Sequence, residues 1–207
     1  MVTYHLAKSD FEIESAVALI SRVYAREGYV KSEEGESGVS AYLRSSTSVT
    51  FLACVGETPV GTISLVGDSE RYLPMDLIYR EELTLLRNTK TRLAEVCQFA
   101  IDTELLKEEK MGTQLDVSTS LLSLVVAHAR SKDYTHLTFT VNPKHRKFYE
   151  MLGAVQIGGE KSYPSVENAP ALGYVLDMTI LNNAEEQSKV RHFLVERILN
   201  RVPVCVE

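Results

Sequence analysis

The sequence predicts an α/β domain with a mixed β-sheet, and three observations carry that prediction. Short β-prone runs alternate with amphipathic helical segments along the 207 residues. A hairpin signal, Val49–Val55 and Val60–Val66 around a turn at 56–59, makes two neighbouring strands antiparallel. Later strands are separated by helical segments, which allows a parallel pair. The order of elements predicts a twisted sheet of about seven strands flanked by helices.

Composition and charge narrow the class of protein. The chain is 44% hydrophobic and 24% charged, with a net charge of −6, which is ordinary for a globular protein and disfavours non-specific nucleic-acid binding. The sequence contains no apolar run long enough for a membrane span and no secretory signal, so we expect a cytoplasmic protein. The length predicts one domain with an appendage, which we place at 1–181 and 182–207.

The N-terminal third begins with a β-prone run at Val2–Leu6. Ser9 and Glu12 form a capping-box signal, and the apolar spacing after it predicts an amphipathic helix that stops near Gly28. Residues 31–48 are rich in Ser, Glu and Gly, which predicts a loop or a short, loosely held helix. Such a segment could act as a lid.

The central third contains a helical segment at 74–88, with Pro74 in its first turn. A nearly continuous apolar run at Arg92–Ile101 predicts a central strand. This strand carries Glu95 and Gln98, two polar residues in a place where burial is costly. Thr113 can cap the next helix, with Asp116 at its third position. We expect the buried stripe of that helix to comprise Leu115, Leu122, Val125, Val126 and Ala129.

The C-terminal third predicts a strand at His136–Val141, followed by a short helix that starts at Asn142-Pro143 and ends at Gly153. Two closing strands follow, at Ala154–Ile157 and Leu172–Leu176. A last amphipathic helix at Glu185–Leu199 is expected to pack on this domain or on a second copy in a homodimer. The apolar face expected for it comprises Val190, Phe193, Leu194 and Ile198.

Metal and hydrolase chemistry have no support in the sequence. The cysteines Cys54, Cys97 and Cys205 are widely spaced and form no CxxC pair, so each is interpreted as a small buried hydrophobe. Scattered Ser and His residues lie outside any nucleophile-elbow or HExxH motif. We therefore expect no metal site.

A family resemblance rests on the segment 136–177. A strand, Asn142, the run K-H-R-K-F-Y-E-M-L-G-A from Lys144, then Tyr163 and A-P-A before an apolar strand resemble the N-acyl amino acid synthases. These enzymes have the GNAT acyltransferase fold and are relatives of the acyl-homoserine lactone synthases. The upstream run A-E-V-C-Q-F-A-I-D resembles the fourth strand of the same group. The resemblance implies a GNAT-like fold whose fourth and fifth strands splay apart to admit a thioester.

The resemblance implies an N-acyltransferase that moves a fatty acyl group from an acyl-carrier protein, or from long-chain acyl-CoA, to the amine of an amino acid or similar small molecule. Glu95 is the candidate general base, because a desolvated carboxylate suits proton removal from an ammonium group. Half of a buried ion pair is its structural alternative. Tyr149 is the candidate donor to the leaving thiolate, or a packing residue. The donor thioester is the one cofactor implied, and none is tightly bound.

The resemblance also implies residues that contact the substrate or the acyl donor. Candidate substrate contacts are Gln98, Phe99, Asn142, His145 and Tyr163, although Asn142 can simply cap its helix. A basic run, Lys144, Arg146 and Lys147 around His145, is either a solvated face or a docking patch for an acidic carrier protein. Lys110, Gly112 and Thr113 are expected near the carrier protein or its pantetheine.

Two departures from the wider pattern bear on the donor. The phosphate loop of acetyl-CoA enzymes has two glycines, whereas residues 108–113 here read E-E-K-M-G-T. The two carboxylates of this loop would repel the phosphates of CoA, which favours an acyl-carrier protein as the acyl donor. Gln98 stands where homoserine lactone synthases tend to have arginine. Two alternatives remain open: an acetyl-CoA-dependent N-acetyltransferase, and a non-enzymatic acyl-binding or regulatory module.

Overall fold

The computed structural model of the chain describes residues 1–29, 40–87, 90–108, 113–182 and 189–200. A single seven-stranded sheet runs through it in the order β1-β2-β3-β4-β5-β7-β6. Its elements are β1 (Val2–Leu6), α1 (Asp10–Arg26), α2 (Ser40–Leu43), β2 (Ser48–Val55), β3 (Thr58–Gly67), α3 (Asp76–Leu86), β4 (Leu93–Ile101), α4 (Thr103–Glu108), α5 (Gln114–Ser131), β5 (His136–Val141), α6 (Arg146–Leu152), β6 (Val155–Tyr163), β7 (Ala169–Asp177) and α7 (Lys189–Asn200), with 3₁₀ turns at Pro143–His145, Pro164–Val166 and Met178–Asn182.

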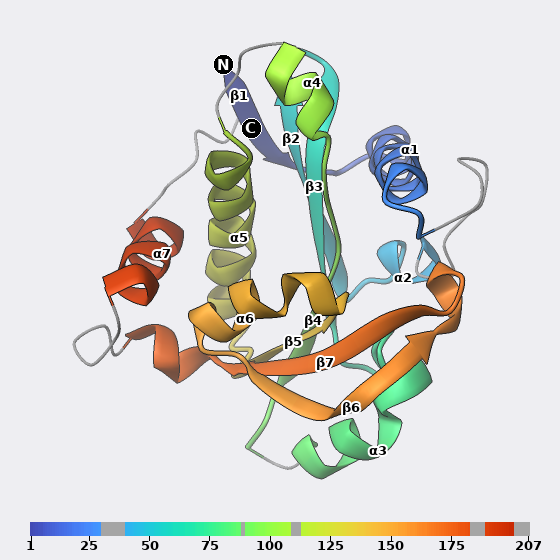
Figure 1. Cartoon of the computed structure of the whole chain (residues 1–207), viewed down its shortest axis with the longest axis vertical. Helices are drawn as coiled ribbons and strands as arrows, with labels where there is room; N and C mark the ends of the chain where they lie inside the picture. Colours follow the sequence, from blue (N-terminus) through green and yellow to red (C-terminus); the bar gives the residue numbers. More distant parts are fainter. Residues whose placement is uncertain (30–39, 88–89, 109–112, 183–188, 201–207) are drawn as a thin grey trace.

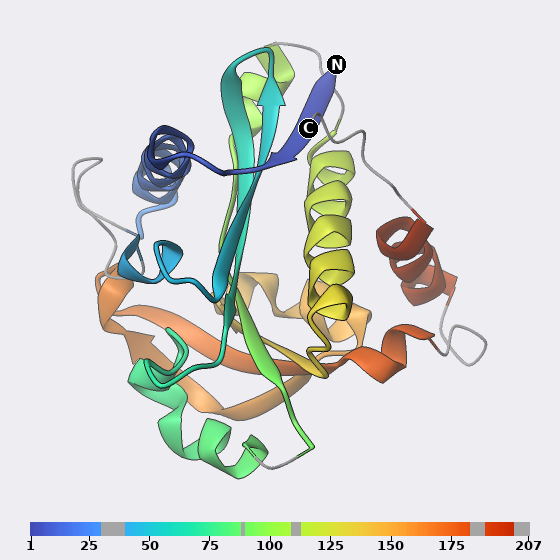
Figure 2. The ribbon, with the colours of Figure 1, turned by 180° about the vertical axis from the view of Figure 1, so that it is seen from behind.

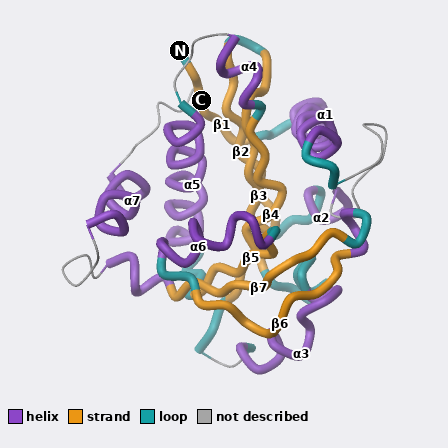
Figure 3. Tube along the Cα trace, in the orientation of Figure 1, coloured by secondary structure: helices purple, strands orange, loops and turns teal. Residues whose placement is uncertain are grey.

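The sheet lies between two layers of helices (Figures 1 and 2). Helix α5 covers one face with α7 outside it, and α1 covers the other face. The main core packs α5 residues such as Val117, Leu121 and Val125 against the strands. Val195 and Ile198 of α7 belong to the same core, so this helix packs on its own chain. A tube coloured by secondary structure shows the strands as the central layer (Figure 3).

The sheet is mixed, as the sequence predicts, because one neighbouring pair is parallel. Strands β4 and β5 pair only from Leu93↔His136 to Val96↔Phe139, whereas all other neighbours are antiparallel. Beyond Val96 the two strands diverge, and Figure 1 shows β7 and β6 crossing the direction of β2 and β3. The expected splay between the fourth and fifth strands is confirmed.

Most local signals are confirmed. Ser9 and Glu12 form the predicted capping box of α1, and Gly153 ends α6 in a left-handed conformation at φ 92°. Strands β1 and β5 have the predicted bounds. The hairpin turn is tighter than expected, because β3 begins at Thr58 and the turn holds only residues 56 and 57. Of the predicted loop at 31–48, residues 30–39 lie outside the described part of the chain, and α2 is a short helix within the rest.

Four expectations about elements are corrected. Helix α4 was not expected, and β6 runs to Tyr163 because a bulge near Gly158, at φ 63°, interrupts its alternation. Leu115 is 39% exposed, since it lies in the first turn of α5 where the strands have parted. Phe193, predicted on the apolar face of α7, is 50% exposed beside Arg197. Ile198 is buried as predicted, together with Val195, which was not predicted, and the side chains of Val190 and Leu194 lie outside the described part of the chain.

Candidate active site

Glu95 lies in the middle of β4 and is 1% exposed. Its Oε2 accepts the backbone N–H of Met75 at 2.7 Å. Met75 is the residue before α3, so its N–H belongs to the free amide groups at a helix start, which favour a negative charge. Among the described residues no cation forms an ion pair with Glu95, which removes the structural alternative for it in that part of the chain.

Burial dominates the ionisation of Glu95. The pKa of this carboxyl is raised from 4.5 to about 8, chiefly by loss of hydration and in smaller part by the nearby Asp76 charge. The Met75 N–H and the Thr140 hydroxyl oppose that rise. A carboxyl with such a pKa exchanges its proton near neutral pH, which is the requirement for a general base.

Aromatic and thiol groups surround Glu95 on the face of β4 turned away from α5. The Glu95 charge adds to burial in raising the pKa values of Tyr163, Tyr42 and Cys97, so these three side chains lie within its electrostatic reach. Tyr163 ends β6 and is 7% exposed. The structure therefore brings Tyr163, a predicted substrate contact, to Glu95. It also keeps the Cys54 and Cys97 thiols protonated and largely buried, as expected, whereas Cys205 lies outside the described residues.

A bulge in β4 separates Glu95 from the second group of predicted residues. Thr62 and Ser64 are two positions apart on β3, but their partners Ala100 and Cys97 are three apart on β4. Gln98 takes up the extra residue at φ 50°, a strained conformation for a side chain of this size. The bulge lies just beyond Val96, where pairing with β5 ends. The bulge of β4 therefore coincides with the place where β4 and β5 part.

A cavity of about 580 Å³ opens beside this bulge, between the end of α1, the end of β4, the start of α5 and helix α6. Its size is in the usual range for a small-molecule site. Its walls bring together three predicted residues, Phe99, His145 and Tyr149. Residues that the sequence did not indicate as part of a site complete it, among them Tyr24, Arg26, Ala100, Leu115 and Ser118. Tyr24 lies on α1 at a position that fits the apolar spacing of that helix, so the sequence pattern alone indicates a packing residue there.

Tyr149 is held in the cavity wall by other aromatic rings. Its ring centre lies 5.1 Å from that of Phe139, 5.4 Å from Phe148 and 6.2 Å from Tyr174. Burial raises the pKa of the Tyr149 phenol, so its hydroxyl stays protonated at neutral pH. Tyr149 can therefore donate a hydrogen bond into the cavity, and it also packs as the structural alternative describes.

His145 lines the cavity, but Asn142 does not. Burial and the neighbouring Lys144 lower the pKa of His145, which keeps its imidazole neutral near pH 7. The Asn142 side chain accepts the Lys144 N–H at 3.1 Å and its amide donates to the Pro170 carbonyl at 3.5 Å. Asn142 therefore caps the 3₁₀ turn, as its structural interpretation predicts.

The basic run is exposed, but two of its members are already paired. Lys144 forms an ion pair with Glu27, the residue after α1, and Arg146 Nε lies 3.5 Å from Glu150 Oε1 one turn along α6. Lys147 is exposed on the same short helix. The run therefore has fewer uncompensated charges than its sequence suggests.

The start of α5 is closed by a capping box. Thr113 Oγ1 accepts the Asp116 N–H, and Asp116 Oδ2 accepts the Thr113 N–H, each at 3.1 Å. Asp116 also forms an ion pair with Arg197 of α7. Lys110 and Gly112, the other two predicted contacts of this loop, lie outside the described residues.

The described residues contain no group of three or more metal-ligating side chains. In the same part of the chain, no helix has the length and apolar character needed to cross a bilayer.

Comparison with known proteins places this geometry in a family. The model of the family described as N-acyl amino acid synthase FeeM matches residues 15–177. The solved structure of FeeM, an N-acyl amino acid synthase from uncultured soil microbes, superposes with a TM-score of 0.82 and 30% identity over 93% of this chain and 98% of that chain. No curated protein sequence matches the chain.

More distant structures share the fold. The acyl-homoserine lactone synthase LasI matches with a TM-score of 0.64 and 14% identity, over 100% of this chain and 97% of that chain. An N-acetyltransferase from Staphylococcus aureus Mu50 matches with a TM-score of 0.57 and 13% identity, over 86% and 99%. The GNAT-like acyltransferase fold with an added C-terminal helix is thereby confirmed. The chain belongs to the N-acyl amino acid synthase family and is an N-acyltransferase.

Proposed function

We propose that this enzyme transfers a fatty acyl group from the thioester of an acyl-carrier protein to the amine of an amino acid or a similar small molecule. The observation that carries the proposal is the placement of Glu95 on β4. It is a buried carboxylate three residues before the Gln98 bulge, at the point where β4 leaves β5. Along β4, the cavity is lined by Phe99 and Ala100 after the bulge, and the Glu95 cluster lies before the bulge.

The two sides suit the two substrates. A pantetheine arm entering the cavity would pass Phe99 and Tyr149 and bring its thioester to the bulge of β4. Backbone amides of that strand could then stabilise the oxyanion, because β4 has no ladder partner in β5 beyond Val96. The amine would approach from the side of Glu95 and Tyr163.

In the proposed reaction, Glu95 is the base and every proton of the substrate ammonium group is accounted for. The substrate ammonium group loses one proton to Glu95, directly or through water, and the free amine attacks the thioester carbonyl. The C–N bond forms and the C–S bond breaks as the tetrahedral intermediate collapses. Of the three ammonium protons, one passes through Glu95 to solvent, one remains on the amide, and one ends on the sulfur.

Tyr149 acts in this scheme as a hydrogen-bond donor to the departing sulfur. A free thiol has a pKa of about 8.5, below that of a phenol whose pKa burial has raised. Complete proton transfer from Tyr149 to the thiolate would therefore be uphill. A hydrogen bond from its protonated hydroxyl stabilises the leaving group without that cost.

The start of α5 favours a donor with a single phosphate. Two of its amides are taken up by the capping box of Thr113 and Asp116, and Asp116 adds a carboxylate where a CoA pyrophosphate would need donors. The single phosphate of a carrier-bound pantetheine makes a smaller demand. Long-chain acyl-CoA is the alternative donor, since some structures of this fold are described as CoA-dependent acyl-homoserine lactone synthases.

Mass spectrometry tests the proposal. The purified enzyme would be given the twenty amino acids as a mixture with a long-chain acyl-carrier protein, a long-chain acyl-CoA or acetyl-CoA. We expect an N-acyl amino acid with the carrier protein and at most slow formation from the CoA thioesters. Acetylated product alone would identify an acetyltransferase, and tight acyl binding without any product would identify a non-enzymatic module. Either outcome overturns the proposal.

A further inference from the structure

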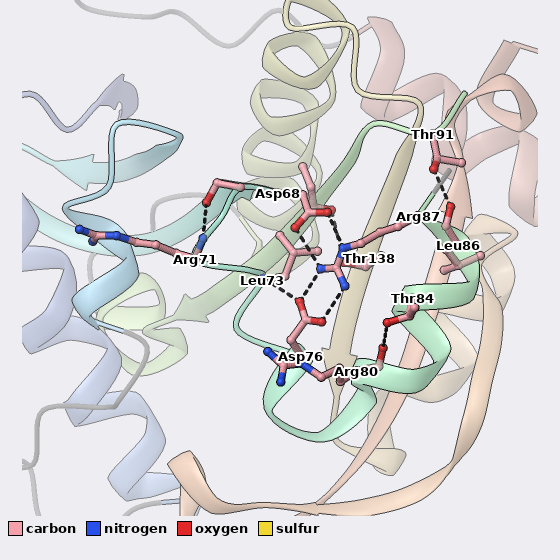
Figure 4. A network of polar contacts seen from close by, with 12 residues as sticks. Asp68, Arg71, Leu73, Asp76, Arg80, Thr84, Leu86, Arg87, Thr91 and Thr138 are labelled. Carbon is pink, nitrogen blue, oxygen red and sulfur yellow. Dashed lines mark hydrogen bonds and ion pairs between the residues drawn. The ribbon is translucent and has the colours of Figure 1, made fainter. Parts of the chain in front are cut away.

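The segment 68–75, which joins β3 to α3, is held at both ends by the side chain of Arg87. The guanidinium donates from Nε and Nη2 to Asp68 at 2.7 and 3.0 Å, and from Nη1 and Nη2 to Asp76 at 2.8 and 2.5 Å. Figure 4 shows the Arg87 guanidinium between the Asp68 and Asp76 carboxylates. Arg87 is the residue after α3, so the end of the helix returns to the segment that starts it.

The conformation of this segment depends on those contacts. The Leu73 N–H donates to Asp76 Oδ2 at 2.8 Å, and the Asp76 N–H donates to the Leu73 carbonyl at 3.0 Å. Tyr72 has φ 63°, which a residue with a side chain keeps only where its surroundings hold it. The centre of the Tyr72 ring lies 5.3 Å from Arg87 Cζ. Asp76 is 7% exposed, and a carboxylate so buried requires a charged or hydrogen-bonding partner.

Met75 lies between Leu73 and Asp76 and donates its N–H to Glu95. Arg87 thereby acts on Glu95 in two ways. It fixes the segment that carries this donor, and it pairs with the Asp76 carboxylate, whose negative charge disfavours ionised Glu95. Both effects favour the carboxylate form that a base needs.

We propose that Arg87 is a positioning residue for the acyl-transfer reaction, one that keeps the Met75 N–H on Glu95 and compensates the charge of Asp76 beside it. The inference rests on the proposed role of Glu95 as the base. The titratable and hydroxyl groups that act on Glu95, or that its charge influences, come from each element around it: Asp76 of α3, Tyr42 of α2, Cys97 of β4, Thr140 of β5 and Tyr163 of β6. Of these, Asp76 is the group that Arg87 pairs with.

Arg87→Met tests the inference, because methionine keeps an unbranched apolar stem and removes the cation. We expect the pKa of Glu95 to rise by about one unit, since a like charge is left uncompensated and a donor is loosened. Turnover at pH 7 should then fall about tenfold and recover as the pH is raised. Arg87→Lys keeps the charge without the two-sided contact and should shift the profile less, in the same direction.

Two further variants separate electrostatics from general damage. Arg87→Met with Asp76→Asn removes both charges, so we expect the pH profile to return toward that of the wild type. Arg80→Met is the matched control, because Arg80 lies on the same helix, 4.5 Å from the Tyr72 ring, and is exposed. Its profile should not move.

A titration of Glu95 itself separates this inference from the proposed function. In protein labelled with [δ-¹³C]glutamate, the Glu95 signal is identified by its loss in Glu95→Gln and followed with pH. An upward shift in Arg87→Met and Arg87→Lys supports the inference even if the wild type transfers no acyl group, which would refute only the proposed function. An unchanged Glu95 titration, with turnover reduced equally at every pH, would show that Arg87 is merely structural. Where Arg87→Met does not fold, Arg87→Lys decides by the same criterion.

Discussion

Lys144, in the 3₁₀ turn before α6, forms an ion pair with Glu27 directly after α1, and its Nζ lies 4.8 Å from the centre of the Tyr29 ring. This ion pair joins two walls of the cavity, since Glu27 lines it after α1 and Lys144 directly precedes His145, which lines it next to α6. The hydrogen bond to Glu27 raises the pKa of Lys144, in keeping with a cation committed to a partner. Lys144 is therefore better placed to close the cavity wall than to attract a distant protein.

A carrier-protein contact should then depend on the outer members of the run, Arg146 and Lys147. Changing both to Glu is expected to reduce kcat/KM for an acyl-carrier protein far more than for a short acyl-pantetheine, because surface charges act mainly on association. The effect should weaken as salt is added. Lys8→Glu with Lys132→Glu, an equal change of charge at exposed positions on other elements, is the control. Equal losses with both donors would assign Arg146 and Lys147 to structure or to the small substrate.

Glu95→Gln should lower turnover by about 10²-fold or more with saturating donor, as expected for loss of a general base. In the wild type, turnover should rise with pH and level off above about 8, because Glu95 must be ionised to accept a proton. The variant should lack that step. Initial rates from pH 6 to 10 measure both effects, and an unchanged rate in Glu95→Gln would remove this residue from the mechanism.

The same burial predicts a pH dependence of stability. The pKa of Glu95 is about 8 in the fold against 4.5 ordinarily, so the folded state binds more protons between these values. Its contribution to the free energy of unfolding is fully present below pH 4.5 and is lost as the pH rises through 8. The loss is up to about 5 kcal/mol in total and about 4 kcal/mol between pH 5 and pH 9, and Glu95→Gln should not show it. Urea unfolding followed by circular dichroism at pH 5 and pH 9 gives the comparison. A variant with the same pH dependence as the wild type would contradict a buried, protonated Glu95.

Tyr149→Phe should reduce turnover only about tenfold, because it removes one hydrogen bond to the leaving sulfur and keeps the ring. Tyr174→Phe is the matched control. Its hydroxyl contacts Glu150 at 3.2 Å, and its ring stacks on Tyr149 at 6.2 Å. Single-turnover rates with donors of different thiol pKa extend the test. A Tyr149→Phe rate equal to that of the wild type for every donor would leave this residue with packing alone.

Acetyl-CoA should bind with a Kd above about 100 μM, whereas a medium- or long-chain acyl-carrier protein should support acylation of an amino acid. The reason lies at the start of α5. There the backbone N–H groups of Thr113 and Asp116 are bound by each other's side chains and are not free to bind a pyrophosphate. Isothermal calorimetry measures the affinity. Micromolar binding of acetyl-CoA, with acetyl transfer that a long-chain carrier protein does not replace, would reassign the enzyme as an acetyltransferase.

Local signals in the sequence determined the elements of this protein. The capping boxes at Ser9 and Thr113, the cap at Asn142 and the glycine at 153 all act within a few residues, and each is found where it was predicted. The family motif in 136–177 likewise indicated the fold and the class of reaction. Glu95 could be singled out because a carboxylate in an apolar strand is conspicuous in the sequence alone.

Only the tertiary structure decided how these residues meet. The bulge at Gln98 arises from a register shift against β3, and the Glu95 contact is a backbone N–H delivered from twenty residues away, which no side-chain pattern encodes. The ion pair of Lys144 with Glu27 joins residues 117 positions apart in the chain, so the basic run could not reveal that it was partly neutralised. Ionisation and charge compensation depend on what the fold brings close. For that reason the sequence indicated the chemistry of the site, and the packing of β4, α3 and α6 determined which groups can carry it out.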